Sequence, residues 1–157
     1  MEDKEIKIQY KEYDNVEQLN NEGIKLLSAA ENNFKNAYAP YSNFQVSACL
    51  ILDNNVIVKG TNVENASYPV SICAERTLLS HTVSNYPNNK IKKIAIYVDK
   101  NLNQPVPPCG LCRQTLLEVE KRQEQHIEII LVSKSGVYVV FEKCADLLPL
   151  YFDGEVL

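Results

Sequence analysis

Apolar residues recur at helical spacing in several segments of the chain. In residues 16–39 they follow one another at intervals of three and four, and the pattern ends at Pro40, since a residue before proline disfavours helix. Residues 74–83 and 109–122 show the same spacing over shorter lengths, the second after Pro107-Pro108. We therefore predict these three helices, and a short closing helix at residues 145–151.

Between the helices lie short runs rich in Val, Ile and Leu, which are typical of strands. Residues 44–52 and 56–58 flank Asp53-Asn54-Asn55 and predict a hairpin, and a further strand is expected at residues 91–98. Residues 127–132 and 137–141 form the last two runs. Ile6, Ile8 and Tyr10 also alternate like a short strand. Strands that alternate with helices indicate an α/β sandwich around a mixed, partly parallel sheet.

The composition fits one globular domain spanning residues 1–157, with 45% hydrophobic residues available for a core. The formal net charge of −4 disfavours binding to long nucleic acid, whose phosphates would be repelled, and favours a small, largely uncharged substrate. The first fourteen residues are charged throughout and resemble no secretory leader.

The longest apolar runs, such as residues 137–141, are far shorter than the roughly 20 residues that span a bilayer. We therefore expect no membrane segment and a cytoplasmic location. Thiols stay reduced in the cytoplasm, so the five cysteines indicate core packing, metal binding or redox chemistry rather than a disulfide framework.

Two cysteine motifs precede predicted helices: Cys73-Ala74-Glu75, and Cys109 with Cys112 in Pro-Cys-Gly-Leu-Cys. Cysteines three positions apart share one face of a helical turn, and Cys73 could add a third thiolate from the other helix. Helix N-termini favour the thiolate form through their unpaired N–H groups. Three protein ligands leave the fourth tetrahedral position of a zinc ion for water, as in catalytic sites.

Glu75 distinguishes between the readings of these cysteines. If Cys73 lies at the tip of its helix, the Glu75 carboxylate can act on water at the metal without being a ligand, which is the arrangement known from zinc deaminases. Neither histidine lies in a His-x-Glu pattern, so the sequence permits a three-cysteine site. Alone, Cys109-x-x-Cys112 would fit a thiol-redox or structural zinc site better than a deaminase. Cys49 and Cys144 lie in apolar runs and are expected in the core.

Several further motifs, in order along the chain, resemble those of the small homotetrameric cytidine deaminases. The resemblance covers roughly residues 19–152 and rests on Ala37-Tyr38-Ala39-Pro40-Tyr41-Ser42-Asn43-Phe44, Asn62-Val63-Glu64-Asn65-Ala66-Ser67-Tyr68, Ile72-Cys73-Ala74-Glu75-Arg76-Thr77, Pro108-Cys109-Gly110-Leu111-Cys112-Arg113-Gln114 and Leu147-Leu148-Pro149. It implies a three-layer α/β/α sandwich around a mixed five-stranded sheet. It leaves residues 1–15 as an extension to which we assign no role.

The resemblance also implies residues that bind a nucleoside. Asn62 and Glu64 correspond to the pair that hydrogen-bonds the ribose hydroxyls, and Phe44 to an aromatic ring that packs on the pyrimidine. The backbone of Ala74, together with Glu75, corresponds to the element that recognises the Watson–Crick edge of the base. Without the resemblance, residues 62–65 would be interpreted as a polar loop and Phe44 as an ordinary core residue.

Three more roles follow from the resemblance alone. Arg76 corresponds to an arginine that hydrogen-bonds the zinc thiolates and offsets their negative charge, and Gln114 to a residue that supports this network. Tyr68 corresponds to a residue that contributes to the active site of a neighbouring subunit, which implies a functional homotetramer. Ser47 and Pro69 depart from glycines common in relatives and could shift loops around the pocket, whereas Leu111 replaces a smaller residue.

The implied activity is a hydrolase reaction of pyrimidine salvage. Cytidine, and 2′-deoxycytidine as well, would be deaminated to the uracil nucleoside and ammonia by a zinc-activated water, with Glu75 carrying protons and one Zn2+ held per chain. One alternative is a deaminase of another cytosine-bearing compound, such as an aminoacylnucleoside antibiotic. Alternatives of another class are a non-catalytic zinc-binding module and a thiol oxidoreductase that uses Cys109 and Cys112.

Overall fold

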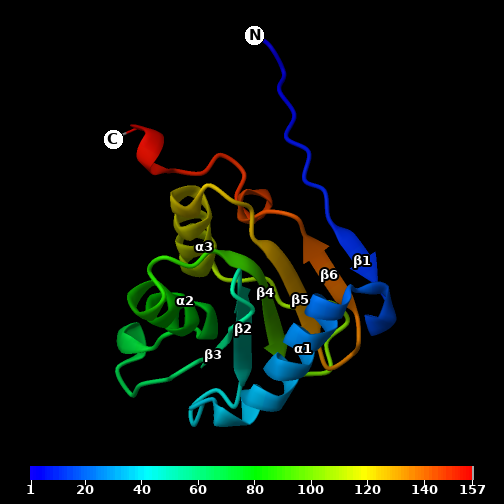
Figure 1. Ribbon diagram of the computed structural model, residues 1–157, viewed down its shortest axis with the longest axis vertical. Coiled ribbons are helices and arrows are strands. Elements are labelled where there is room, and N and C mark those ends of the chain that lie inside the picture. Colours follow the sequence, from blue (N-terminus) through cyan, green and yellow to red (C-terminus); the bar gives the residue numbers. More distant parts are fainter. Residues whose placement is uncertain (157) are drawn as a thin grey trace.

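The computed structural model describes residues 1–156 and shows a mixed sheet of six strands with helices packed against it (Figure 1). The strand order is β1-β6-β5-β4-β2-β3; β4 and β5 run parallel, and the other neighbouring pairs run antiparallel. The strands are Lys11–Tyr13 (β1), Val46–Leu52 (β2), Ile57–Thr61 (β3), Ile91–Val98 (β4), Glu128–Ser133 (β5) and Tyr138–Phe141 (β6). The α-helices are Asn21–Asn33 (α1), Ala74–Asn85 (α2) and Gly110–Gln123 (α3).

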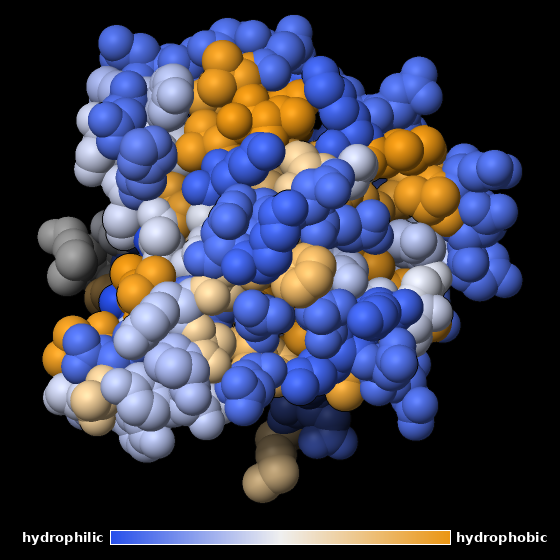
Figure 2. All heavy atoms as spheres, turned by 90° about the horizontal axis from the view of Figure 1, so that it is seen from below, coloured by the Kyte–Doolittle hydropathy of each residue, from blue (hydrophilic) through white to orange (hydrophobic). Residues whose placement is uncertain are grey.

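The surface is largely hydrophilic on the face drawn in Figure 2, where hydrophobic side chains form separate patches among polar ones. Within residues 1–156, no helix has the length and apolar character needed to cross a membrane. Hydrophobic residues are instead concentrated on the two faces of the sheet.

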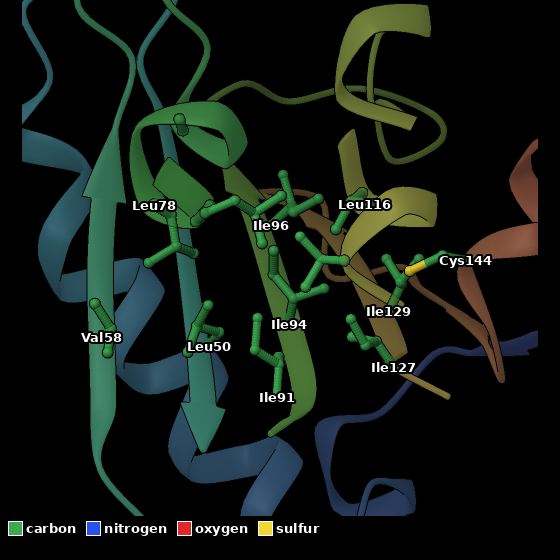
Figure 3. Packing of buried hydrophobic residues seen from close by; sticks show 14 of the residues in the cluster. Leu50, Val58, Leu78, Ile91, Ile94, Ile96, Leu116, Ile127, Ile129 and Cys144 are labelled. Atoms are coloured by element: carbon green, nitrogen blue, oxygen red, sulfur yellow. The ribbon is translucent and has the colours of Figure 1, made fainter. Parts of the chain in front are cut away.

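Each face of the sheet carries its own hydrophobic cluster. Successive residues of a strand point to opposite faces, so Leu50 of β2 packs with residues of α2 and α3 while Ile51 packs with residues of α1. Figure 3 shows Leu78 of α2 and Leu116 of α3 gathered with residues of the central strands. Strands covered on both faces need apolar residues at successive positions, which explains the continuous apolar runs. The predicted three-layer α/β/α sandwich is thus confirmed.

The sheet has six strands rather than the predicted five because residues near the N-terminus join it. Lys11–Tyr13 pairs with β6, and the ring of Tyr10 lies 5.6 Å from that of Phe141. The alternation of Ile6 and Ile8 predicted a strand slightly too early, since both residues are exposed and lie outside the sheet. The N-terminal strand starts only at Lys11, where the backbone groups of β6 are close enough to form hydrogen bonds. Alternation of apolar residues in the sequence does not determine where such partners lie.

The long helix predicted at residues 16–39 is divided into three parts. A 3-10 turn at Val16–Gln18 precedes α1, and another at Phe34–Asn36 follows it. The division arises at Asn20, whose side chain accepts a hydrogen bond of 2.9 Å from the backbone N–H of Gly23 and so caps α1. The apolar spacing continued across this boundary because all three parts pack on the same face of the sheet.

The closing helix predicted at residues 145–151 is a shorter 3-10 turn, Cys144–Leu147. Pro149 follows it, and Leu150 adopts a left-handed backbone with φ of 54°. Proline disfavours helix in the residue before it and lacks the N–H that a helix would need. The chain therefore leaves the helical path as it passes the end of α3.

Gly60 allows β3 to approach the first turns of α2 closely. A Cβ atom at this position would lie 2.8 Å from Cβ of Leu78 and 2.9 Å from the carbonyl oxygen of Ala74. Such distances are too short for any side chain, so glycine is required here. The contact holds the end of β3 beside the beginning of α2, where the candidate site lies.

Candidate active site

Three cysteine sulfurs from two helix N-termini meet in space. Cys73 is the residue immediately before α2, Cys109 immediately precedes α3, and Cys112 lies in the first turn of α3. The Sγ atoms of Cys73 and Cys109 are 3.9 Å apart, and those of Cys109 and Cys112 are 3.5 Å apart. All three Sγ atoms lie within 4.8 Å of one another.

These separations fit a zinc ion. With Zn–S bonds of about 2.3 Å and tetrahedral angles, ligand sulfurs stand roughly 3.8 Å apart. The three-cysteine cluster is therefore suitable for one Zn2+ per chain. Within residues 1–156, this is also the one group of at least three histidine, cysteine or acidic side chains close enough together to hold a metal ion.

The three thiols differ in how readily they ionise. Partial burial of the sulfur raises the pKa of Cys109, but the backbone N–H groups of Cys112 and Leu111, which lie toward the thiol, and contacts with the other two thiols outweigh it and leave the pKa below its usual range. Burial raises the pKa of Cys73 and, more strongly, that of Cys112, and the negative charge of Glu75 acts in the same direction. The thiols therefore influence one another's ionisation.

Glu75 is a buried carboxylic acid in the first turn of α2. Only 5% of its surface is exposed, and burial raises its pKa above the usual range, while a hydrogen bond with the Cys112 thiol acts in the opposite direction. A carboxyl group with a raised pKa beside a metal-binding cluster is suited to accept and return a proton. Glu75 thus lies buried two residues beyond Cys73, and its catalytic role stays a prediction.

Asn62 holds the loop in front of β2. Its side-chain oxygen accepts a hydrogen bond of 2.9 Å from the backbone N–H of Val46, and its amide nitrogen donates one of 2.8 Å to the carbonyl oxygen of Phe44. The Phe44 side chain is half-buried at this point. Asn62 and Phe44 therefore belong to one structural unit, although 18 positions separate them in the chain.

Glu64 binds the same loop before β2 at Tyr41 and Ser42. Its carboxylate accepts hydrogen bonds from the backbone N–H groups of Tyr41 and Ser42, at 2.9 and 3.3 Å, and a further bond from the Ser42 hydroxyl. These bonds, the hydroxyl bond foremost, hold the pKa of Glu64 below its usual range, so the group is charged near neutral pH. The Ser42 hydroxyl in turn accepts a bond of 3.0 Å from the N–H of Phe44.

Two of the remaining predicted residues frame the site. Ala74 is the first residue of α2, is fully buried, and lies between Cys73 and Glu75. Tyr68 has 69% of its surface exposed, and its ring meets that of Tyr41 edge-on with centroids 5.9 Å apart. Ala74 is thus part of the metal-binding end of α2, whereas Tyr68 faces outward.

Arg76 and Gln114 do not join the thiols through hydrogen bonds in the described part of the chain. Arg76 is half-buried and forms neither a hydrogen bond nor an ion pair within residues 1–156. The Gln114 amide donates a bond of 2.9 Å to the carbonyl oxygen of Phe152, near the end of the chain. Their expected support of the zinc thiolates therefore stays a prediction.

Sequence reasoning assigned no role to Ser42 and Arg113, although both stand in the motifs that carry the resemblance. Ser42 links Glu64 to the backbone of Phe44, and the Arg113 guanidinium binds two carbonyl oxygens next to the metal-binding turn. The sequence offered one indication of both roles: Ser42 lies two residues before Phe44, and Arg113 directly follows Cys112.

Comparison with known proteins gives a consistent result. Residues 21–125 match the family described as "Cytidine and deoxycytidylate deaminase zinc-binding region". A cytidine deaminase of Mycoplasma genitalium is 45% identical over 107 residues, covering 68% of this chain and 78% of that protein. A cytidine deaminase of Halalkalibacterium halodurans is 45% identical over 83 residues, which cover 53% of this chain and 61% of that protein, less than two thirds of its length.

Solved structures agree with the sequence relatives. The crystal structure of cytidine deaminase from Burkholderia pseudomallei superimposes with a TM-score of 0.72 at 37% identity, over 82% of this chain and 97% of that one. The matched family region contains all three cysteines and Glu75. The resemblance noted in the sequence is thereby confirmed, and the chain belongs to the family of cytidine and deoxycytidylate deaminases that carry this zinc-binding region.

Proposed function

We propose that this protein is a zinc-dependent cytidine deaminase, which converts cytidine and 2′-deoxycytidine, with water, to the corresponding uracil nucleoside and ammonia. The observation that carries the proposal is the buried Glu75 carboxyl beside three cysteine sulfurs that fit one zinc ion. A structural zinc site has no need of such an acid. The relatives named above, each called a cytidine deaminase, support the substrate.

Cys73, Cys109 and Cys112 would hold the zinc ion, leaving its fourth coordination position free of protein. Bound there, zinc supplies Lewis acidity that lowers the pKa of water, in favourable sites to about 7. Three thiolates weaken this effect because they reduce the positive charge of the metal. A protein base is therefore needed as well, and Glu75 is the buried acid in position to serve as one.

Glu75 carries the protons of the reaction. Its carboxylate accepts a proton from the attacking water and delivers it to N3 of the cytosine ring, while the water oxygen bonds to C4. The same carboxyl then gives the second water proton to the departing amino group, and the C4–N bond breaks to release ammonia. Burial favours this exchange because the raised pKa brings the carboxyl nearer to neutral pH.

The nucleoside would bind between the metal-binding end of α2 and the loop before β2. Phe44 would pack on the pyrimidine, the backbone of Ala74 would meet the edge of the base, and Asn62 and Glu64 would bind the ribose hydroxyls. Glu64 supports this assignment because it is ionised and can accept bonds from hydroxyls. One amide hydrogen of Asn62 is used by the Phe44 carbonyl, which leaves the second for the ligand.

We also propose that the chain acts as a homotetramer with shared active sites. Exposed hydrophobic residues lie on the loops beside the candidate site, and Tyr68 stands among them. They are Tyr38, Tyr41, Val63, Tyr68 and Val70. Apolar side chains gathered at one surface are typical of subunit contacts.

Two further proposals concern domain and location. The two hydrophobic clusters share one sheet, which supports the predicted single domain; of its range, residues 1–157, Leu157 lies outside the described residues. All five cysteines are unpaired in the structure, and three of them are needed as thiols for metal binding. This supports a cytoplasmic location, where thiols stay reduced.

The test of the activity is to incubate the purified protein with cytidine and follow ultraviolet absorbance and ammonia release, before and after zinc is removed by a chelator. We expect uridine and ammonia in equal amounts, loss of turnover on chelation, and recovery when zinc is returned. A folded protein with one zinc per chain that leaves both nucleosides unchanged would contradict the proposal, and conversion of an aminoacylnucleoside antibiotic would then identify the other substrate class. Turnover that needs a disulfide and no zinc would establish the thiol oxidoreductase instead.

A further inference from the structure

Arg113, the residue after Cys112, holds two separate segments of the chain together. Its Nε donates a hydrogen bond of 2.7 Å to the carbonyl oxygen of Pro108, and its Nη1 donates one of 2.9 Å to the carbonyl oxygen of Leu147. Pro108 directly precedes Cys109, whereas Leu147 ends the 3-10 turn that follows β6. No carboxylate of residues 1–156 forms an ion pair with Arg113, so both contacts are to backbone alone.

The segment that contains Leu147 is itself fixed to α3 by a second side chain. The Glu120 carboxylate, 5% exposed, accepts hydrogen bonds from the backbone N–H groups of Cys144, at 2.8 Å, and Ala145, at 3.4 Å. It also accepts a bond of 2.8 Å from the N–H of Ile127, just before β5. A buried carboxylate with three N–H partners is a rigid connection, so Arg113 is anchored to a fixed point.

Apart from the Arg113 contact, few side-chain contacts hold the backbone of the metal-binding turn at Cys109 and Gly110. Neither Cys73 nor Cys109 caps its helix through a side-chain hydrogen bond, and Cys109 is exposed. Gly110 has open space around its Cα, with no atom within 4 Å of a Cβ built there. A bond that fixes the Pro108 carbonyl therefore also fixes the orientation of the backbone that leads into Cys109.

We propose that Arg113 is a positioning residue for the metal site: by clamping the Pro108 carbonyl to the Leu147 carbonyl, it holds Cys109 in place to bind zinc and ties zinc retention to the segment Cys144–Leu147. The inference rests on the zinc ligands of the proposed function but concerns a residue that touches neither metal nor substrate. Groups that orient metal ligands in this way commonly affect metal affinity by about 10- to 100-fold.

The shape of the guanidinium explains why an arginine performs this role. Its planar group offers N–H donors in fixed directions, so Nε and Nη1 can reach two carbonyls at once. The ammonium of a lysine is a single point of charge on a flexible stem. Replacement by lysine would keep the charge but would not reproduce both bonds, which separates an effect of geometry from an effect of charge.

The experiment measures how fast the zinc-loaded protein gives up its metal to excess chelator, with a chromophoric indicator and without substrate. For Arg113→Ala we expect release at least about tenfold faster than for the unaltered chain, and for Arg113→Lys a smaller but clear acceleration. Substitution of cobalt for zinc provides a second readout, because the sulfur-to-cobalt absorption bands should shift or weaken in both variants.

Two control variants on the same helix separate positioning from general loosening. Arg122→Ala removes an exposed arginine and should leave release unchanged. Val119→Ala thins the core beneath α3 and should lower the Tm, yet leave the release rate within about twofold of the original. If Val119→Ala releases zinc as fast as an Arg113 variant with the same Tm, the faster release reflects lower overall stability and not the two Arg113 hydrogen bonds. The inference is then wrong.

The inference is also overturned if both Arg113 variants release zinc at the original rate. Should Arg113→Ala fail to fold, Arg113→Lys carries the same comparison. Because release is read without substrate, a chain that holds zinc but does not deaminate cytidine would contradict the proposed function and leave this test intact. A chain that binds no zinc would overturn the ligand assignment and the inference together.

Discussion

Cys73 and Cys109 are 36 positions apart in the chain, yet their sulfur atoms lie 3.9 Å from each other at the N-termini of α2 and α3. The two helices lie side by side on one face of the sheet, as Figure 1 shows, and pack into the same hydrophobic cluster. The packing of this cluster therefore sets the distance between the two sulfurs before any metal binds.

Replacement of Cys73 or Cys109 by serine should abolish stoichiometric zinc. A neutral hydroxyl is a much weaker zinc ligand than a thiolate, and only two sulfurs would remain. Metal analysis of the purified variants checks this. Cys49→Ala is the matched control: Cys49 is buried in the other cluster, so its replacement should leave one zinc per chain. One full zinc in Cys109→Ser would show that the ligand assignment is wrong.

Glu75→Gln should keep zinc and lose turnover. The amide has almost the same shape but cannot accept and return a proton, so kcat should fall by at least about 10²-fold. Steady-state kinetics on cytidine, together with metal analysis, measures both effects. Glu118→Gln, at an exposed position of α3, should behave like the original protein. Near-normal turnover of Glu75→Gln would remove this residue from the mechanism.

Ser42→Ala should weaken substrate binding more than chemistry. The hydroxyl donates a hydrogen bond to Glu64 and accepts one from the N–H of Phe44. Its loss therefore makes both the proposed ribose-binding and the proposed base-binding residue less rigidly held. A typical hydrogen bond contributes about 1 kcal/mol, so we expect KM for cytidine to rise roughly three- to tenfold with kcat little changed. Ser84→Ala is the control, because this hydroxyl, near the C-terminal end of α2, donates to the Ser80 carbonyl and touches none of these groups. An equal fall in kcat with unchanged KM would contradict the assignment.

Glu120→Ala should destabilise the fold. It leaves buried N–H groups of Ile127 and Cys144 without their acceptor, at a cost of about 2 to 3 kcal/mol in the free energy of unfolding. Urea denaturation of the zinc-loaded protein measures the change. Glu118→Ala, exposed on the same helix, should change stability by less than about 0.5 kcal/mol. Equal stability of the two variants would show that the Glu120 contacts carry no net energy.

Glu22 predicts a pH dependence of stability. A hydrogen bond from Lys92 lowers the pKa of this carboxyl, opposed in part by burial and assisted by the charges of Lys92 and Lys93. Because the folded pKa lies below the unfolded value, the pair stabilises the fold above about pH 4.5, and this contribution disappears as pH falls through the folded pKa.

The effect of this pair is small, because 40% of the Glu22 side chain is exposed and solvent screens it. Glu22→Gln should therefore lower stability by no more than about 0.5 kcal/mol at pH 7, and the difference should vanish in acid. Urea denaturation of both proteins across this range provides the measurement. A difference that grows toward low pH would have the wrong sign for this pair.

Much of the fold could be predicted from local patterns. Strands buried on both faces, such as β4 at Ile91–Val98, appear as continuous apolar runs, and the structure starts and ends β4 where the run does. The spacing of Cys109 and Cys112 defined two of the proposed ligands because one helical turn determines their geometry. Glu75 followed from its place two residues after Cys73.

Other features depend on contacts between distant segments. The sixth strand forms only because β6 presents a free edge to Lys11–Tyr13, and residues 6–10 have no such partner despite their alternation. The Gln114 amide meets the backbone of Phe152, 38 positions away, a contact that no local motif encodes.

The sequence by itself thus determined the family, through motifs spread along the chain, and most of the strands and helices and the cysteine motifs of the candidate zinc site, because these depend on neighbours within a turn or a strand. Tertiary structure alone decided how α2 and α3 bring Cys73 to Cys109, how Ser42 joins Glu64 to Phe44, and how Arg113 ties Pro108 to Leu147. The physical reason is that hydrogen-bond partners and metal ligands are selected by distance in space, which packing of the whole core fixes.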